Sequence, residues 1–205
     1  MNLPNKLTVL RILLVPVIVV IYYLGKLGVI NGDFINIPIT NWLIIILFSI
    51  ASYTDHLDGK LARKNNKITT FGKFADPLAD KILVLAMMLI LVETGRIPAW
   101  IPIIVLFREF AVSGYRLIVV EQSGQVISAN IWGKIKTVTQ MIAIISSFIN
   151  INNTNIFGEF IKGNLIGLPL LINLFTTVMF IISTIATIFS GYEYLKDSKE
   201  LLKDC

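Results

Sequence analysis

The chain has 205 residues, of which 55% are hydrophobic and only 15% are charged, and its mean hydropathy is +0.77. This balance excludes an ordinary soluble domain and predicts one integral membrane domain over residues 1–205. The formal net charge of +5 comes mostly from residues near the expected span ends, which indicates contact with lipid headgroups, and no nucleic-acid partner is expected.

The chain begins with a short polar segment, residues 2–11, which we expect to lie at the membrane interface. Six apolar runs then predict helical spans, and the second continues as a helix into a charged motif because nothing before Asn65 strongly breaks it. The expected spans are residues 8–27, 41–65, 72–92, 100–120, 131–149 and 166–189. Segments 28–40 and 150–164 are expected to be loops, and the charged tail 193–205 to be helical. The predicted fold class is an all-α integral membrane protein with six transmembrane helices.

Positive charge is distributed unevenly over the loops. Three basic groups would lie on the same side of a six-span protein: Lys60, Arg63, Lys64, Lys67 and Lys73; Lys134 and Lys136; and Lys196, Lys199 and Lys203. Cytoplasmic loops carry an excess of lysine and arginine. We therefore expect both termini and the charged motif to face the cytoplasm of a cell membrane. Frequent use of Ile, Asn and Lys suggests a bacterium with an AT-rich genome, in which this membrane would be the plasma membrane.

One charged motif interrupts the apolar chain. It consists of Asp55, Asp58, Gly59, Ala62, Arg63, Gly72, Asp76 and Asp80. Charges in or beside membrane spans are costly, so such a cluster indicates a functional site. Asp55 and Asp58 are three residues apart, and Asp76 and Asp80 are four residues apart. On a helix, the two members of each pair therefore share one face. Four converging carboxylates would repel one another without a cation, and their oxygens suit one or two Mg²⁺ or Mn²⁺ ions.

The other residues of the motif suit a phosphorylated substrate. Gly59, Ala62 and Gly72 leave space for the close approach of a nucleotide or its phosphates. Arg63 can hold a phosphate through two hydrogen bonds. Two metal ions would match phosphoryl transfer, in which they clamp a diphosphate. The alternative, from spacing alone, is a pair of solvated helix ends with small residues that pack helices together.

The residue types of the motif and the spacings between them match the signature of the CDP-alcohol phosphatidyltransferases, and the chain resembles that family. The resemblance implies a six-helix membrane enzyme, usually a homodimer, that transfers a phosphatidyl group from CDP-diacylglycerol to an alcohol and releases CMP. It also implies that Asp55, Asp58 and Asp76 bind metal, and that Asp80 both ligates metal and acts as general base on the acceptor hydroxyl. The implied CDP-diacylglycerol site is formed by Asp58, Gly59, Ala62, Arg63 and Gly72.

Three further segments resemble the bacterial phosphatidylglycerophosphate synthases within that family. They contain Asn5, Thr8 and Arg11; Arg108, Glu109, Ser113 and Arg116; and Gly133, Lys134, Lys136, Thr137 and Gln140. This resemblance implies glycerol 3-phosphate as the acceptor. From residue 142 on, only the hydropathy of the chain matches that of these synthases. Asn5, Thr8, Arg11 and Lys136 are candidates for supporting roles.

The cations of the later segments suit an acceptor that carries a phosphate. Arg108 and Arg116 are about 80° apart around a helix, so they can lean toward one cavity. A phosphate needs such cations, whereas free serine or inositol does not. Lys134 and Lys136 point in nearly opposite directions on a helix, and we favour Lys134 as the third phosphate ligand. The alternative is an ion pair of Arg108 with Glu109 and snorkelling of Arg116 to the interface.

Other functions remain open on the sequence alone. The same chemistry could use inositol phosphate, another glycerol phosphate isomer or serine, of which serine fits the cations least. A divalent-cation transporter would also hold carboxylates in the membrane, but these lie near helix ends and no second set marks an exit path. A non-catalytic lipid-binding scaffold would not need all four aspartates.

Overall fold

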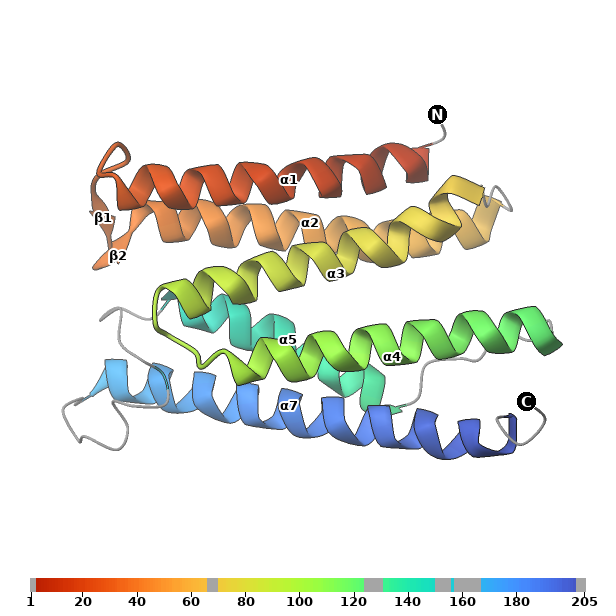
Figure 1. The fold of residues 1–205 in the computed structure, drawn as a ribbon. Coiled ribbons are helices and arrows are strands. Elements are labelled where there is room, and N and C mark those ends of the chain that lie inside the picture. Colours follow the sequence, from red (N-terminus) through yellow and green to blue (C-terminus); the bar gives the residue numbers. More distant parts are fainter. Residues whose placement is uncertain (1–2, 66–69, 124–130, 150–155, 157–166, 202–205) are drawn as a thin grey trace. The chain divides into compact units, whose positions relative to one another are not determined.

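The computed structural model describes residues 3–65, 70–123, 131–149, 156 and 167–201, and their side chains except for 3–5, 55–65, 70–77, 116–123, 195 and 197–201. This part of the chain is mostly helical (Figure 1). Its long helices are α1 Leu3–Lys26, α2 Ile39–Asn65, α3 Thr70–Glu93, α4 Trp100–Ser123, α5 Ile131–Ile149 and α7 Leu168–Leu201. Each segment expected to span the membrane thus lies almost wholly within one of these helices, and the prediction of a mostly helical fold is confirmed for the described residues. The number of membrane crossings and the side of the termini stay predictions.

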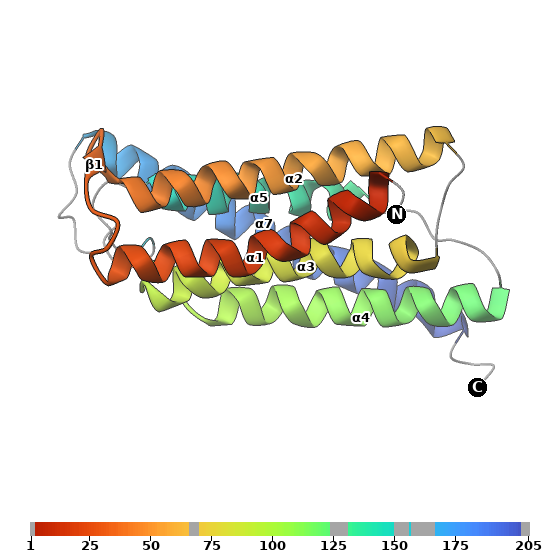
Figure 2. The ribbon, with the colours of Figure 1, turned by 90° about the horizontal axis from the view of Figure 1, so that it is seen from above.

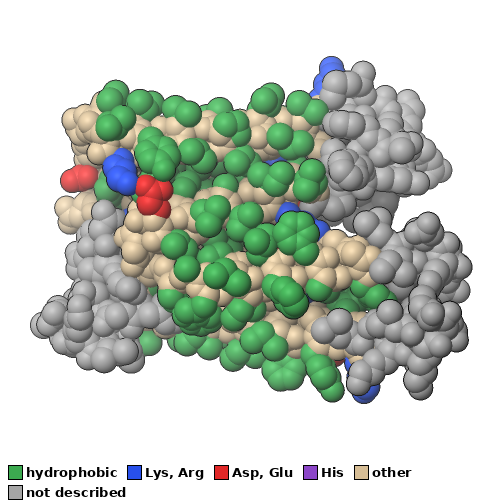
Figure 3. Space-filling model, in the orientation of Figure 1, with side chains coloured by type: hydrophobic (Ala, Val, Ile, Leu, Met, Phe, Trp, Pro, Cys, Tyr) green, Lys and Arg blue, Asp and Glu red, His purple; other side chains and the backbone are tan. Residues whose placement is uncertain are grey.

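Among the residues described, two helices are long and apolar enough to cross a membrane: α1 over Lys6–Lys26 and α7 over Leu168–Tyr194. The apolar part of α2, Ile39–Thr54, is shorter. Large apolar side chains are exposed, with Phe107 at 74% and Phe110 at 64%. Hydrophobic side chains cover much of the face drawn in Figure 3. Exposed apolar surface of this extent is unusual in soluble monomers and suits contact with lipid.

The chain forms two compact units. Unit 1 comprises Met1–Thr94 with Phe148–Asn153, and within it α1 packs against both α2 and α3 (Figures 1 and 2). Buried apolar residues come from all three helices, as Ile18, Phe48 and Leu83 illustrate. Between helices that lie in lipid, close van der Waals packing of such side chains is the main favourable contribution, because lipid tails are as apolar as the side chains themselves. Helix α1 therefore holds in place the two helices that carry the aspartate motif.

Residues 3–11 do not form an element separate from the first expected span, and their place at the membrane interface stays a prediction. Helix α1 is continuous from Leu3 to Lys26, so these residues are its first turns. Pro4 does not break the helix because an amide N–H in the first turn has no intrahelical partner to lose.

An exposed ion pair joins the far end of α1 to the end of α3. Nζ of Lys26 lies 2.6 Å from Oε1 of Glu93, and the hydroxyl of Tyr23 donates to Oε2 of Glu93 at 3.1 Å. The hydrogen bond from Lys26 lowers the pKa of Glu93 below its ordinary value. Because both side chains are exposed to solvent, the pair contributes little to stability.

The expected loop 28–40 contains a short hairpin. Strands β1 Asp33–Phe34 and β2 Ile37–Pro38 pair antiparallel. Ile35 and Asn36 form the turn with φ of 56° and 57°, as a two-residue turn with left-handed residues requires. The sequence does not predict this hairpin because a β-branched isoleucine is rarely found at such a position.

Unit 2 comprises Gly95–Ser147 with Thr154–Cys205, and within it α4 packs against α7. Arg96 is only 2% exposed, and its Nη1 donates to the carbonyl of Ser147 at 2.5 Å. The carbonyl of Arg96 accepts a hydrogen bond from the amide of Ile156 at 2.9 Å. The last carbonyls of a helix lack intrahelical donors, so the buried guanidinium of Arg96 caps the C-terminal end of α5.

Helix α7 unites two elements that were expected separately, the span 166–189 and the helical tail. It runs unbroken from Leu168 to Leu201, and residues 202–205 lie outside the described part. Its buried hydroxyls donate to carbonyls four residues earlier, as Thr184 does to Phe180 at 2.8 Å. Such bonds satisfy polar groups within the helix itself. The expected loop 150–164 lies outside the described residues apart from Ile156.

Candidate active site

The aspartate motif lies where α2 ends and α3 begins. Residues Asp55, Asp58, Gly59, Ala62 and Arg63 belong to the C-terminal part of α2, and Gly72, Asp76 and Asp80 to the N-terminal part of α3. Only residues 66–69 separate the two helices, so the halves of the motif meet at one end of unit 1, on the right in Figure 1. The helical backbone that the spacing argument assumed is therefore confirmed for both aspartate pairs.

The donor set of the motif fits a divalent cation. Four carboxylates on two connected helix ends supply hard oxygen ligands of the kind that Mg²⁺ and Mn²⁺ prefer. The side chains of residues 55–65 and 70–77 lie outside those described, and Asp80, near the first described side chains of α3, is partly buried. Among the described side chains no group of three or more His, Cys, Asp or Glu forms. Which aspartates bind a metal stays a prediction.

Two of the residues expected to have supporting roles are buried near the motif. Arg11 is 1% exposed, and its Nε donates to the carbonyl of Ala51 at 3.3 Å. Ala51 lies about one helical turn before Asp55. Thr8, about one turn before Arg11 in α1, is fully buried. Arg11 therefore places a permanent positive charge beside the turn of α2 that leads into the aspartates, while the side chain of Asn5 lies outside those described.

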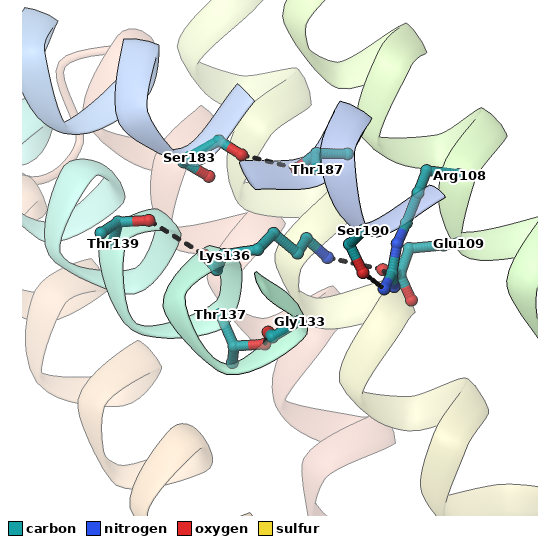
Figure 4. A network of polar contacts seen from close by, with 9 residues as sticks. All are labelled: Arg108, Glu109, Gly133, Lys136, Thr137, Thr139, Ser183, Thr187 and Ser190. Carbon is teal, nitrogen blue, oxygen red and sulfur yellow. Dashed lines mark hydrogen bonds and ion pairs between the residues drawn. The ribbon is translucent and has the colours of Figure 1, made fainter. Parts of the chain in front are cut away.

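A cluster of charged and hydroxyl side chains joins α4, α5 and α7, the helices described in unit 2 (Figure 4). Oε1 of Glu109 lies 2.8 Å from Nη1 of Arg108 and 2.5 Å from Nζ of Lys136. Nη2 of Arg108 also donates to the hydroxyl of Ser190. The side chains of Arg108 and Lys136 are only 12% and 8% exposed. One carboxylate oxygen on α4 thus serves as the counter-charge of two largely buried cations, one on α4 and one on α5.

This cluster has spare capacity for an anion. A guanidinium has five N–H donors and an ammonium three, and the contacts above use two from Arg108 and one from Lys136. Nε of Arg108 is buried and donates to no described group. Two cations beside one carboxylate leave a net positive charge. A phosphate, which accepts several charge-assisted hydrogen bonds, is the ligand that such a group of donors suits best.

The structure places the predicted acceptor residues unequally. Arg108 lies in the cluster and pairs with Glu109, the contact that the sequence left open as an alternative. Lys136, expected only in a supporting role, is the lysine of the cluster, whereas Lys134 is exposed. The side chain of Arg116 lies outside those described. Phosphate binding by these residues stays a prediction.

The contribution of α7 to this cluster was missed in the sequence. Ser190 is fully buried against Arg108, and Tyr194 is 5% exposed with its ring facing the guanidinium. A signal was present, because Thr187, Ser190 and Tyr194 recur at helical spacing within an otherwise apolar run. That spacing does not reveal which helix the polar face meets.

Comparison with known proteins now decides the family. The sequence model of the CDP-alcohol phosphatidyltransferases matches residues 1–189, which include the whole aspartate motif and parts of both units. The chain belongs to the CDP-alcohol phosphatidyltransferase family. The prediction of the family from the motif is thereby confirmed.

Several relatives align with this CDP-alcohol phosphatidyltransferase over nearly their whole length. A protein of Bacillus subtilis (strain 168) is 43% identical, over 98% of this chain and 97% of its own. A protein of Rickettsia bellii (strain RML369-C) is 34% identical, over 97% and 96%, and one of Haemophilus influenzae (strain ATCC 51907 / DSM 11121 / KW20 / Rd) is 32% identical, over 99% and 96%. All three are named CDP-diacylglycerol–glycerol-3-phosphate 3-phosphatidyltransferase.

Membership of the CDP-alcohol phosphatidyltransferases makes the protein a membrane-associated transferase of phospholipid biosynthesis. Membership of this family accounts for the exposed apolar side chains of the helices and for the presence of four aspartates in a largely apolar chain. The transporter and scaffold alternatives explain neither the full motif nor the match over residues 1–189.

Proposed function

We propose that this protein transfers the phosphatidyl group of CDP-diacylglycerol to glycerol 3-phosphate, giving phosphatidylglycerophosphate and CMP. The observation that carries this function is the near full-length similarity to relatives named for that reaction, up to 43% identical. The complete aspartate motif on α2 and α3 supports it. The nearest alternative keeps the chemistry and uses another acceptor, such as inositol phosphate or serine.

We assign the metal and nucleotide roles to the aspartate motif. Asp55, Asp58, Asp76 and Asp80 would hold one or two Mg²⁺ or Mn²⁺ ions. A bound ion would neutralise charge on the diphosphate of CDP-diacylglycerol and on the departing CMP. The residues that would bind CDP-diacylglycerol are Asp58, Gly59, Ala62, Arg63 and Gly72.

Asp80 is the general base of the proposed reaction. Its carboxylate takes the proton from a hydroxyl of the acceptor while that oxygen bonds to the phosphorus that carries the diacylglycerol. The bond from this phosphorus to the oxygen shared with CMP breaks, and CMP leaves with the electron pair. Asp80 suits the role because it is only partly buried, at the C-terminal end of the motif.

The cluster of unit 2 is the proposed binding site for the phosphate of the acceptor. Arg108 and Arg116 were expected to bind this phosphate together with Lys134. Because Lys136 lies beside Arg108 through Glu109, we add Lys136 to this set. Both cations of the cluster can contact one phosphate without losing the shared carboxylate.

We further propose that the protein crosses a bacterial plasma membrane six times, as a homodimer, with both termini and the aspartate motif on the cytoplasmic side. The lysine- and arginine-rich segments support this orientation, since they would all lie on that side. Surrounding membrane lipids would cover the exposed apolar faces.

The choice of acceptor is tested by comparing glycerol 3-phosphate, glycerol, inositol 1-phosphate and serine in an assay of CMP release by the purified protein. A site built for the phosphate should favour glycerol 3-phosphate over glycerol by about 10³-fold or more in kcat/KM. Preference for inositol 1-phosphate would keep the role of the cations and replace the acceptor. Preference for serine would overturn both.

Removal of divalent cations should abolish the reaction. We expect EDTA to lower CMP release by about 10²-fold or more, since metal ions contribute several kcal/mol to phosphoryl transfer. Added Mg²⁺ or Mn²⁺ in excess of the chelator should restore it. Full activity in chelated protein, with residual metal measured to be absent, would contradict the role given to the four aspartates.

A further inference from the structure

The side chain of Arg108 contacts α7 at three points, two on its guanidinium and one on its stem. Its Nη2 donates to the hydroxyl of Ser190, and its Cζ lies 5.7 Å from the centre of the Tyr194 ring, within range of a cation–π interaction. A Cβ atom on Gly191 would lie 3.4 Å from Cγ of Arg108, so the arginine stem runs against the backbone of α7 at the glycine. The three α7 residues thus form a cradle for one side chain of α4.

The α7 residues that form the cradle are themselves held by packing. Ser190 is fully buried and Tyr194 is 5% exposed. The ring of Tyr194 also packs edge to face against Tyr115 of α4, with centroids 6.4 Å apart and planes at 70°. Neither residue can therefore move far without disturbing the packing of α4 on α7.

Rigidity matters because an arginine side chain is otherwise flexible. Ordering it upon ligand binding costs conformational entropy, and a guanidinium already fixed in position avoids that cost. Glu109 holds Nη1, Ser190 holds Nη2 and the tyrosine ring covers one face of the guanidinium. The donors left for a ligand then point in fixed directions, which binding sites need for affinity and selectivity.

We propose that Ser190, Gly191 and Tyr194 are positioning residues that aim the Arg108 guanidinium, and that the last helix thereby sets the affinity of the enzyme for the acceptor phosphate. The inference rests on the proposed function, in which Arg108 binds that phosphate. It gives α7 a part in substrate selection, which the sequence analysis did not assign to this helix.

Steady-state kinetics of the full-length protein in detergent test this role. Ser190→Ala removes the hydroxyl, and we expect it to raise the KM for glycerol 3-phosphate by about tenfold, a typical effect of losing one hydrogen bond to a charged group. The KM for CDP-diacylglycerol should stay unchanged. Thr184→Val is the matched control, because it removes another buried hydroxyl of α7 that bonds within its own helix.

The aromatic contact has its own pair of variants. Tyr194→Phe keeps the ring and should retain a KM for glycerol 3-phosphate near that of the wild type, whereas Tyr194→Leu removes the ring and should raise this KM.

A double variant tests whether Ser190 acts through Arg108. If Ser190 only positions this arginine, Ser190→Ala should not raise the KM for glycerol 3-phosphate further in an Arg108→Gln background, since no arginine is left to position.

The kinetic outcomes test the cradle and the proposed function separately. Selective changes in the KM for glycerol 3-phosphate, lost in the Arg108→Gln background, support the cradle. Equal changes in both KM values, or values for Ser190→Ala and Tyr194→Leu that match Thr184→Val, overturn it while leaving the proposed function intact. Absence of CMP release dependent on glycerol 3-phosphate in the wild type would instead overturn the proposed function.

Discussion

Replacing Asp80 with asparagine is expected to lower kcat by about 10²- to 10⁴-fold, the usual contribution of a general base. Asparagine has nearly the same shape but cannot accept the proton of the acceptor hydroxyl. Binding of CDP-diacylglycerol should persist, because the motif keeps Asp55, Asp58 and Asp76. The measurement is single-turnover CMP release at saturating concentrations of both substrates, together with binding of a CDP analogue.

Two controls separate the base from a metal ligand and from a general loss of charge. Raising the Mg²⁺ concentration should not rescue Asp80→Asn, whereas it would rescue a variant that had only lost metal affinity. Asp33→Asn removes an exposed carboxylate of the β1 hairpin and should behave like the wild type. Full turnover in Asp80→Asn would show that another group takes the proton.

Replacing Arg108 with glutamine should raise the KM for glycerol 3-phosphate by about 10²-fold, because hydrogen bonds to charged groups contribute about 1.5–3 kcal/mol. The change also leaves Glu109 with Lys136 as its remaining partner in the cluster, which lowers the net charge offered to a phosphate. Arg108→Lys keeps the charge but loses the planar fork of donors, so an intermediate KM is expected.

The controls for this prediction concern position and charge. Lys196→Gln removes an exposed positive charge from α7 and should leave the KM for glycerol 3-phosphate unchanged. Lys136→Gln should raise this KM more than Lys134→Gln does, because Lys136 shares the Glu109 carboxylate with Arg108. Equal KM values for the wild type and Arg108→Gln would remove the cluster from the acceptor site.

Hydropathy predicts the helices of this chain well, because a long apolar segment in a membrane protein has few alternatives to a helix. The expected spans 72–92 and 100–120 fall within α3 and α4. Prediction failed where local chemistry decides the outcome. The hairpin turn at Ile35 breaks the usual residue preferences, and residues 3–11 are continuous with the first expected span because Pro4 is tolerated in the first turn of α1.

The candidate site also has a part that the sequence predicts and a part that it does not. The aspartate motif is local, so its spacing and the helices of α2 and α3 could be predicted together. The choice between Lys134 and Lys136 depends on how α5 is rotated within unit 2, and a short apolar sequence does not determine that rotation. The contacts of Arg108 with Ser190 and Tyr194 join residues more than 80 positions apart, as the Ser190 bond shows with a separation of 82. Only the packing of α4 on α7 reveals them.

The transfer itself is measured with glycerol 3-phosphate labelled in its carbon skeleton. The purified full-length protein is given CDP-diacylglycerol and Mg²⁺ in detergent, and the label is followed into the chloroform-soluble fraction while CMP is quantified. The proposed reaction predicts that labelled lipid and CMP appear in equal amounts, and that neither appears when either substrate is omitted. Release of CMP without labelled lipid would mean that water is the acceptor, and it would contradict phosphatidyl transfer to glycerol 3-phosphate.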